Sequence, residues 1–127
     1  MLRELAGLNA LVTGGGSGIG RAIAEGLAQA GTVLREVSEA TAVQPPIRWR
    51  PSDVTDRGQV AELVQWVEAE LGPLEILVNS AGTNVANRLM ANLAPDDFEH
   101  VLAANTTGTF NCIHAVLPGM RKRGSGL

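Results

Sequence analysis

The sequence contains no tyrosine, and its other aromatic residues are two tryptophans and two phenylalanines. Its single cysteine, Cys112, excludes an internal disulfide and fits a reducing compartment, so we expect a cytoplasmic protein. No apolar run approaches the ~18 residues of a membrane-spanning helix. The N-terminal stretch MLRELAGLNA also lacks the long apolar region of a signal peptide. We therefore expect no membrane association and no secretion leader.

An excess of positive charge is also absent. The net charge is −3 and the isoelectric point is about 5.3, which argues against nucleic acid as a partner because phosphate binding needs a basic face. The one basic cluster, RKRG at residues 121–124, is interpreted as the cationic end of a helix. With 45% hydrophobic residues in 127, the chain predicts one globular domain over residues 1–127.

Hydrophobic spacing predicts alternating strands and helices. Leu8–Thr13 indicates a short buried strand, and Ile19–Ala30 has an apolar face at helical spacing. Asp56, with Gln59 three residues later, is typical of a helix N-cap. The further predicted elements are an extended segment at 47–54, a helix at 55–72, a strand at 74–79 and a long helix from Pro95 to near Gly124. This alternation predicts an α/β fold with a mainly parallel sheet.

The segment Thr32–Val43 is ambiguous. Val33, Leu34 and Val37 have helical spacing, whereas a strand would restore the regular alternation of strand and helix but with poorly alternating side chains. We favour a helix, which the prolines at positions 45 and 46 would end.

A glycine-rich loop, TGGGSGIG, joins the first predicted strand to the first helix. Gly14, Gly18 and Gly20 leave bare backbone beside a helix N-terminus, whose free N–H groups bind anions such as a pyrophosphate. The spacing is not G-x-G-x-x-G, and no lysine follows the glycines as in a Walker A loop. Taken alone, the glycines also allow a flexible loop that binds nothing.

Four motifs come in one order along the chain: TGGGSGIGRAIA, DVTD, LVNSAG and AANTTGTF. Together they resemble the short-chain dehydrogenase/reductase family over nearly the whole chain. The resemblance implies a Rossmann-like doubly wound parallel sheet and a cofactor that is NAD or NADP. It also implies hydride transfer between the nicotinamide and a small-molecule carbonyl or secondary alcohol.

The resemblance also implies roles for residues of the first motif. Gly14, Gly18 and Gly20 would turn around the cofactor pyrophosphate, and Ser17 and Ile19 would lie beside it.

The second and third motifs correspond to the adenine and ribose sites. Asp53 would accept a hydrogen bond from the adenine amino group, with Val54 against the ring. Asn79, Ala81 and Gly82 would border the cofactor ribose, with Ser80 in place of the family's second asparagine. Asp53 could instead cap a turn, and Asn79 could satisfy backbone groups at a strand end.

Asn105 matches the family's helix asparagine, a catalytic residue that helps to hold a proton-relay water. It lies on the apolar face of its predicted helix, where a purely structural hydrogen bond is the alternative. His100 and His114 are too far apart to share a helical turn, and we expect no metal site.

The chain departs from the family in two places. The family's Tyr-x-x-x-Lys pair is absent, because there is no tyrosine and Pro118 stands four residues before the only lysine, Lys122. The interval from Gly31 to Asp53 is too short for the family's strand and helix. We therefore expect an incomplete sheet that lacks its second strand and the catalytic C-terminal half, and the preference for NAD or NADP stays unassigned.

Three functions stay open. The chain could be the cofactor-binding half of an oxidoreductase whose full-length form is a homo-oligomer, a dimer or tetramer. It could instead be an inactive dinucleotide-binding module, or an oligomerisation module that uses the helix from Pro95 to Arg123.

Overall fold

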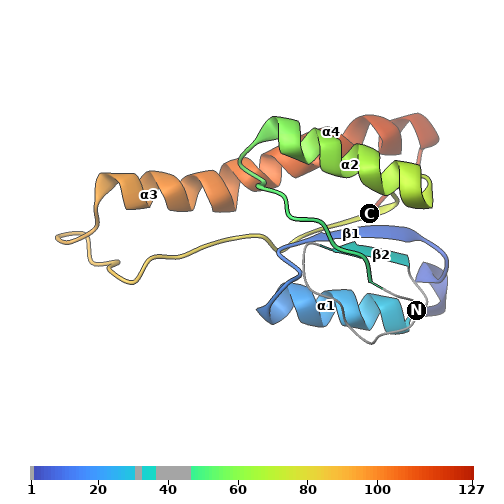
Figure 1. The fold of residues 1–127 in the computed structure, drawn as a ribbon, viewed down its shortest axis with the longest axis horizontal. Coiled ribbons are helices and arrows are strands. Elements are labelled where there is room, and N and C mark those ends of the chain that lie inside the picture. Colours follow the sequence, from blue (N-terminus) through green and yellow to red (C-terminus); the bar gives the residue numbers. More distant parts are fainter. Residues whose placement is uncertain (1, 31–32, 37–46) are drawn as a thin grey trace.

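The computed structural model describes residues 2–30, 33–36 and 47–127 (Figure 1). A short 3₁₀ helix at Leu2–Leu5 precedes the sheet. Three parallel strands lie in the order β2-β1-β3: β1 is Asn9–Thr13, β2 is Val33–Glu36 and β3 is Ile76–Asn79. The central strand therefore pairs on both sides, as its position between two crossover connections requires.

Helices cover both faces of this sheet (Figure 1). The helix α1, Gly18–Gln29, lies on one face, while α2, Arg57–Leu71, and α4, Gly108–Arg123, lie on the other. Side chains alternate along β1 in the same way. Ala10 and Val12 pack in one buried cluster with residues of α1, and Leu11 packs in another with residues of α2 and α4. The predicted α/β fold with a doubly wound parallel sheet is confirmed.

The expectation of a helix at Thr32–Val43 is wrong for Val33–Glu36, which form strand β2. The expectation that the second strand is missing is wrong for the same reason. Val33 lies in register with Asn9, and Glu36 with Val12. A buried central strand needs hydrogen-bond partners along both edges, and this tertiary demand overrides the local helical spacing. Thr32 and the part from Val37 to Val43 lie outside the described residues.

Helix α2 begins as its cap signal predicts. The Asp56 side chain accepts a hydrogen bond from the backbone N–H of Gln59 at 3.0 Å. The helix ends before Gly72, whose φ is +99°. In the part of the chain that the structure describes, no helix is both long and apolar enough to cross a membrane.

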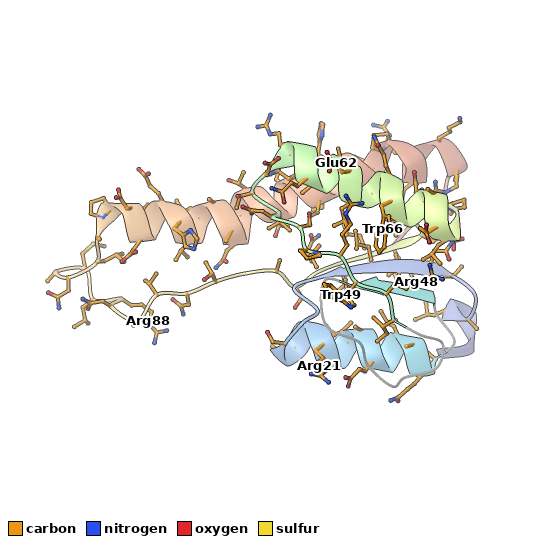
Figure 2. The ribbon with its side chains drawn as sticks, viewed as in Figure 1. Arg21, Arg48, Trp49, Glu62, Trp66 and Arg88 are labelled. Atoms are coloured by element: carbon orange, nitrogen blue, oxygen red, sulfur yellow. The ribbon has the colours of Figure 1, made fainter. Side chains whose placement is uncertain are left out.

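The segment predicted as extended, 47–54, has one β-bridge residue, Arg48, and a turn that begins at Val54. It also pairs by charge with α2. Arg48 donates to Glu70 at 2.7 Å, and Arg50 lies 3.7 Å from Glu62 and 5.8 Å from the centre of the Trp66 ring. Figure 2 shows Glu62 and Trp66 on α2 with Arg48 on the segment beneath them. These contacts are partly exposed, so they contribute little to stability.

The long helix predicted from Pro95 is present but changes its hydrogen-bonding pattern midway. Helix α3 is Pro95–Leu102, a π-helical segment follows at Ala103–Thr107, and α4 continues to Arg123. Gly124 ends it with a left-handed φ of +69°. Helix α3 and the connection before it, which carries Arg88, extend away from the sheet (Figure 2).

The outer edge of β3 is paired with the last residue of the chain. The N–H of Leu127 donates to the carbonyl of Glu75 at 2.9 Å, and the Leu127 carbonyl accepts from the N–H of Leu77 at 2.8 Å. This two-bond pattern is that of a parallel ladder.

Candidate functional site

The C-terminal ends of β1 and β3 meet at one edge of the sheet, where the glycine loop turns into α1. Ser17 is the N-cap in an extended conformation, and its side chain makes no capping hydrogen bond. Within this described helix, no acidic side chain lies in the first turn. The first N–H groups of α1 and the positive end of its dipole are therefore left for an external anion.

The structural surroundings of Gly14, Gly18 and Gly20 differ. A Cβ on Gly14, whose φ is +65°, would lie 2.6 Å from Cα of Ala81. A Cβ on Gly20 would lie 2.9 Å from Oγ of Ser80. Gly18 has a φ of +55°, and apart from its chain neighbours and the backbone of α1 no described atom lies within 4 Å of a Cβ built there. Gly14 and Gly20 are thus required by packing, whereas the missing side chain of Gly18 faces open space.

Two predicted neighbours of the loop are exposed. Ser17 is exposed, and Ile19 leaves 78% of its surface open to solvent, although it is a large apolar side chain at the start of α1. An apolar side chain so exposed beside a helix N-terminus is available to contact a ligand.

Thr13 ties the two strand ends together, and sequence reasoning missed it. Its side chain is 1% exposed. The backbone N–H groups of Ser80 and Ala81 donate to Thr13 Oγ1 at 3.2 and 3.1 Å, and Oγ1 donates to the Val78 carbonyl at 3.5 Å. A polar residue closing an apolar strand just before the glycines was the available signal.

The residues of the third motif lie at the end of β3 and directly after it. Asn79 is in register with Thr13 and is exposed, while Ala81 lies against Gly14. A Cβ on Gly82 would lie 3.0 Å from Oδ1 of Asn105, so the motif and the π-helical segment are in contact.

Asn105 uses both polar groups of its side chain on the backbone of Thr83. Oδ1 accepts from the Thr83 N–H at 2.6 Å, and Nδ2 donates to the Thr83 carbonyl at 2.9 Å. The structural hydrogen bond considered as an alternative is therefore present. The π-helical segment that carries Asn105 is a distortion common at functional sites.

Asp53 forms a tight turn with Thr55. Oδ1 accepts from the Thr55 N–H at 2.9 Å and from its Oγ1 at 2.7 Å. These two hydrogen bonds lower the pKa of the Asp53 carboxyl below its usual value, so the group is anionic at neutral pH. The turn-capping alternative is thus also present, and it leaves the second oxygen, Oδ2, with no hydrogen bond to a described residue.

The turn Asp53–Thr55 contacts α4 at Gly108 and Asn111, two residues that sequence reasoning missed. Val54 lies so close to Gly108 that a Cβ there would be 3.2 Å from Cβ of Val54. Nδ2 of the buried Asn111 donates to the Val54 carbonyl at 2.9 Å. No local pattern distinguished Asn111 from the other polar residues of its helix.

Other reactive side chains lie outside this edge. Burial raises the pKa of the Cys112 thiol to about 11, and His114 stacks on Phe110 with ring centres 5.6 Å apart. Among residues 2–30, 33–36 and 47–127, no group of three or more His, Cys, Asp or Glu side chains could hold a metal ion.

A family model described as short chain dehydrogenase matches residues 8–127. The chain belongs to the short-chain dehydrogenase family. Glycine betaine reductase of Emericella nidulans is 38% identical over an alignment 135 residues long. The alignment covers 96% of this chain and 10% of that protein. Acetoacetyl-CoA reductase of Paracoccus denitrificans is 36% identical over 124 residues, which cover 92% of this chain and 51% of that protein.

A solved structure of a short-chain type dehydrogenase/reductase from Mycobacterium ulcerans matches with a TM-score of 0.85 at 29% identity, covering 96% of this chain and 50% of that one. The resemblance seen in the four motifs is therefore confirmed, as is the Rossmann-like fold. The short-chain dehydrogenase chain described here spans about half the length of that structure and of the acetoacetyl-CoA reductase.

Proposed function

We propose that the chain binds a nicotinamide dinucleotide, NAD or NADP, over the C-terminal ends of β1 and β3. The observation that carries this proposal is Gly18, which begins α1 with a left-handed φ. Apart from its chain neighbours and the backbone of α1 itself, no described atom lies within 4 Å of a Cβ built there. A pyrophosphate there would accept hydrogen bonds from the first N–H groups of α1. Gly14 and Gly20 would hold the loop against the end of β3, and Ser17 and Ile19 would border the cofactor.

The adenine end of the dinucleotide would lie over the turn that begins at Asp53. Oδ1 of Asp53 is occupied by Thr55, and we propose that Oδ2 accepts a hydrogen bond from the adenine amino group, with Val54 beside the ring. The residues proposed to border the ribose follow from the end of β3: Asn79, Ala81 and Gly82.

When bound, the nicotinamide supplies or accepts a hydride, and we propose that the whole protein is an oxidoreductase acting on a small-molecule carbonyl or secondary alcohol. Asn105 is the catalytic residue proposed within this chain. Through its two hydrogen bonds it would hold Thr83 and the segment after β3 in place, with a proton-relay water beside it. A reducing compartment suits the single buried thiol, and we propose the cytoplasm as the location.

The proton for a developing alkoxide needs another donor. The chain has no tyrosine, and its one lysine, Lys122, lies in the last turn of α4. We therefore propose that these 127 residues alone hold the cofactor without turnover. An inactive dinucleotide-binding module is the alternative function.

Cofactor binding is tested by titrating the chain with NADH and NADPH and following their fluorescence. Gly18→Val should weaken binding at least tenfold, or about 1.4 kcal/mol, because a branched side chain would fill the pyrophosphate space. Gly7→Val is the matched control, since Gly7 also has a positive φ, +82°, and open surroundings. A folded Gly18→Val chain with undiminished affinity contradicts the proposal.

Activity is tested separately with the same chain and a panel of ketones and secondary alcohols, following NAD(P)H absorbance. No protein-dependent turnover is expected. Turnover that disappears in Asn105→Ala would mean that the chain holds a proton donor other than tyrosine.

A second proposed property is homo-oligomer formation, as a dimer or tetramer of the whole protein. Along α3 and α4, four large apolar side chains spaced at helical intervals are 43 to 52% exposed: Phe98, Leu102, Ile113 and Leu117. Exposed apolar side chains of this size on a helix favour association. Light scattering of the whole protein tests it, and Ile113→Asp should shift the mass toward the monomer; an unchanged mass would contradict this interface.

A further inference from the structure

Asn111 is a buried polar residue on α4 whose side chain bonds to the described residues only through its amide nitrogen. Its side chain is 4% exposed. Nδ2 donates to the carbonyl of Val54 at 2.9 Å and to that of Thr55 at 3.4 Å. Its Oδ1 is buried and has no hydrogen-bond partner among the described residues. The contact joins residues 57 and 56 positions apart, and so fixes a surface turn onto a distant helix.

The same face of α4 makes room for this turn. Gly108 precedes Asn111 by three residues, about one helical turn, so the two lie on one side of the helix. A Cβ on Gly108 would collide with the side chain of Val54. Gly108 and Asn111 therefore form the surface of α4 against which the turn Asp53–Thr55 packs.

The unpartnered Oδ1 of Asn111 raises the question why this position holds an asparagine and not an apolar residue. A buried acceptor without a donor is unfavourable, and an apolar side chain of similar size would avoid that loss while filling the same space. Packing alone therefore does not account for Asn111. What an apolar residue could not supply is the pair of hydrogen bonds to the Val54 and Thr55 carbonyls.

We propose that Asn111 is a positioning residue for the adenine end of the dinucleotide, an inference that rests on the proposed cofactor site. Its Nδ2 holds the backbone of Val54 and Thr55 against α4. Thr55 in turn holds Oδ1 of Asp53, which leaves Oδ2 directed by a fixed turn. Asn105 and Asn111 then anchor two separate cofactor-side segments, through Thr83 and Val54, to one continuous helix.

The test compares three ligands on the same chain: NADH, AMP and reduced nicotinamide mononucleotide. Asn111→Asp keeps the shape of the side chain but replaces the donor with an acceptor. Asn111→Ser removes the amide without adding charge, in case the aspartate variant does not fold. Asn87→Asp is the matched control, because Asn87 is exposed and lies on the connection after β3.

Both Asn111 variants should bind NADH and AMP at least tenfold more weakly and bind reduced nicotinamide mononucleotide as the unaltered chain does. The backbone N–H of Asp56, bonded to the Asp53 carbonyl at 3.1 Å, should also exchange its hydrogen faster in both variants. Equal losses for all three ligands, or no loss for AMP, overturn the inference. If the unaltered chain binds no dinucleotide, the proposed function fails. Unchanged exchange at Asp56 would overturn the positioning role by itself.

Discussion

Gly14 and Ala81 are in backbone contact, although one follows β1 and the other follows β3. A Cβ on Gly14 would lie 2.6 Å from Cα and 2.7 Å from N of Ala81. The Ala81 N–H also donates to Oγ1 of Thr13, the residue just before Gly14. The glycine loop therefore starts from a point that the neighbouring strand holds in place.

Replacing Gly14 by alanine should destabilise the fold more than the same change at Gly7. Both glycines have positive φ, so each replacement should cost about 1–2 kcal/mol for the left-handed backbone. Only at Gly14 does the new Cβ collide with a backbone, which should add about 1–3 kcal/mol. Urea unfolding measures both losses. Equal losses at the two positions would show that β1 and β3 can move apart at little cost.

Thr13→Val should destabilise the chain by about 2 kcal/mol, because it leaves two partly buried backbone N–H groups without their acceptor. Thr13→Ser keeps the hydroxyl and is the matched control, with a smaller loss from the missing methyl group. Urea unfolding separates the two variants. A valine variant as stable as the serine variant would mean that Oγ1 holds neither Ser80 nor Ala81 in solution.

Asp53→Ala should weaken the binding of AMP and leave that of reduced nicotinamide mononucleotide unchanged, as measured by competition with NADH. The hydrogen bonds from Thr55 lower the pKa of Asp53 below 3.8, so its carboxylate stays ionised from pH 8 to pH 5. Its contribution to AMP binding should therefore be constant over that range. Because the folded pKa is lowered, the stability it contributes is lost only as the pH falls through that folded value. Equal losses for both ligands would mark Asp53 as a turn cap alone.

Thr55→Val is the companion variant for that pKa. Removing the Oγ1 hydrogen bond, the largest cause of the shift, should raise the pKa of Asp53 toward 3.8. NMR titration of the Asp53 carboxyl measures it. An unchanged pKa would mean that the side chain of Thr55 does not hold the carboxylate.

Cys112 should make the fold sensitive to alkaline pH. Burial raises the pKa of its thiol from 9.0 to about 11, so the folded chain retains a proton that the unfolded chain loses. This stabilising contribution is complete below pH 9 and declines as the pH rises toward 11. Urea unfolding at pH 8 and pH 10 should show the decline in the unaltered chain and a smaller one in Cys112→Ala. Identical declines in both would contradict the shifted pKa.

The features predicted from the sequence are those whose causes lie close together along the chain. Asp56 and Gln59 are three residues apart, so their spacing predicts the cap of α2 directly. The helix from Pro95, the strand at β3 and the glycine turn into α1 likewise have local signals. The four ordered motifs were enough for the family, because each keeps its residues within a few positions.

Only the tertiary structure decided the contacts between distant segments. Strand β2 forms because the backbone of β1 needs hydrogen-bond partners along its second edge. The spacing of Val33 and Leu34 in the sequence does not indicate this need. Thr13 reaches Ser80 across 67 positions, and Asn111 reaches Val54 across 57. A polar side chain in an apolar run indicates that it needs a hydrogen-bond partner. Which partner it finds depends on how the strands and helices pack, because that packing alone brings the two groups within hydrogen-bonding distance.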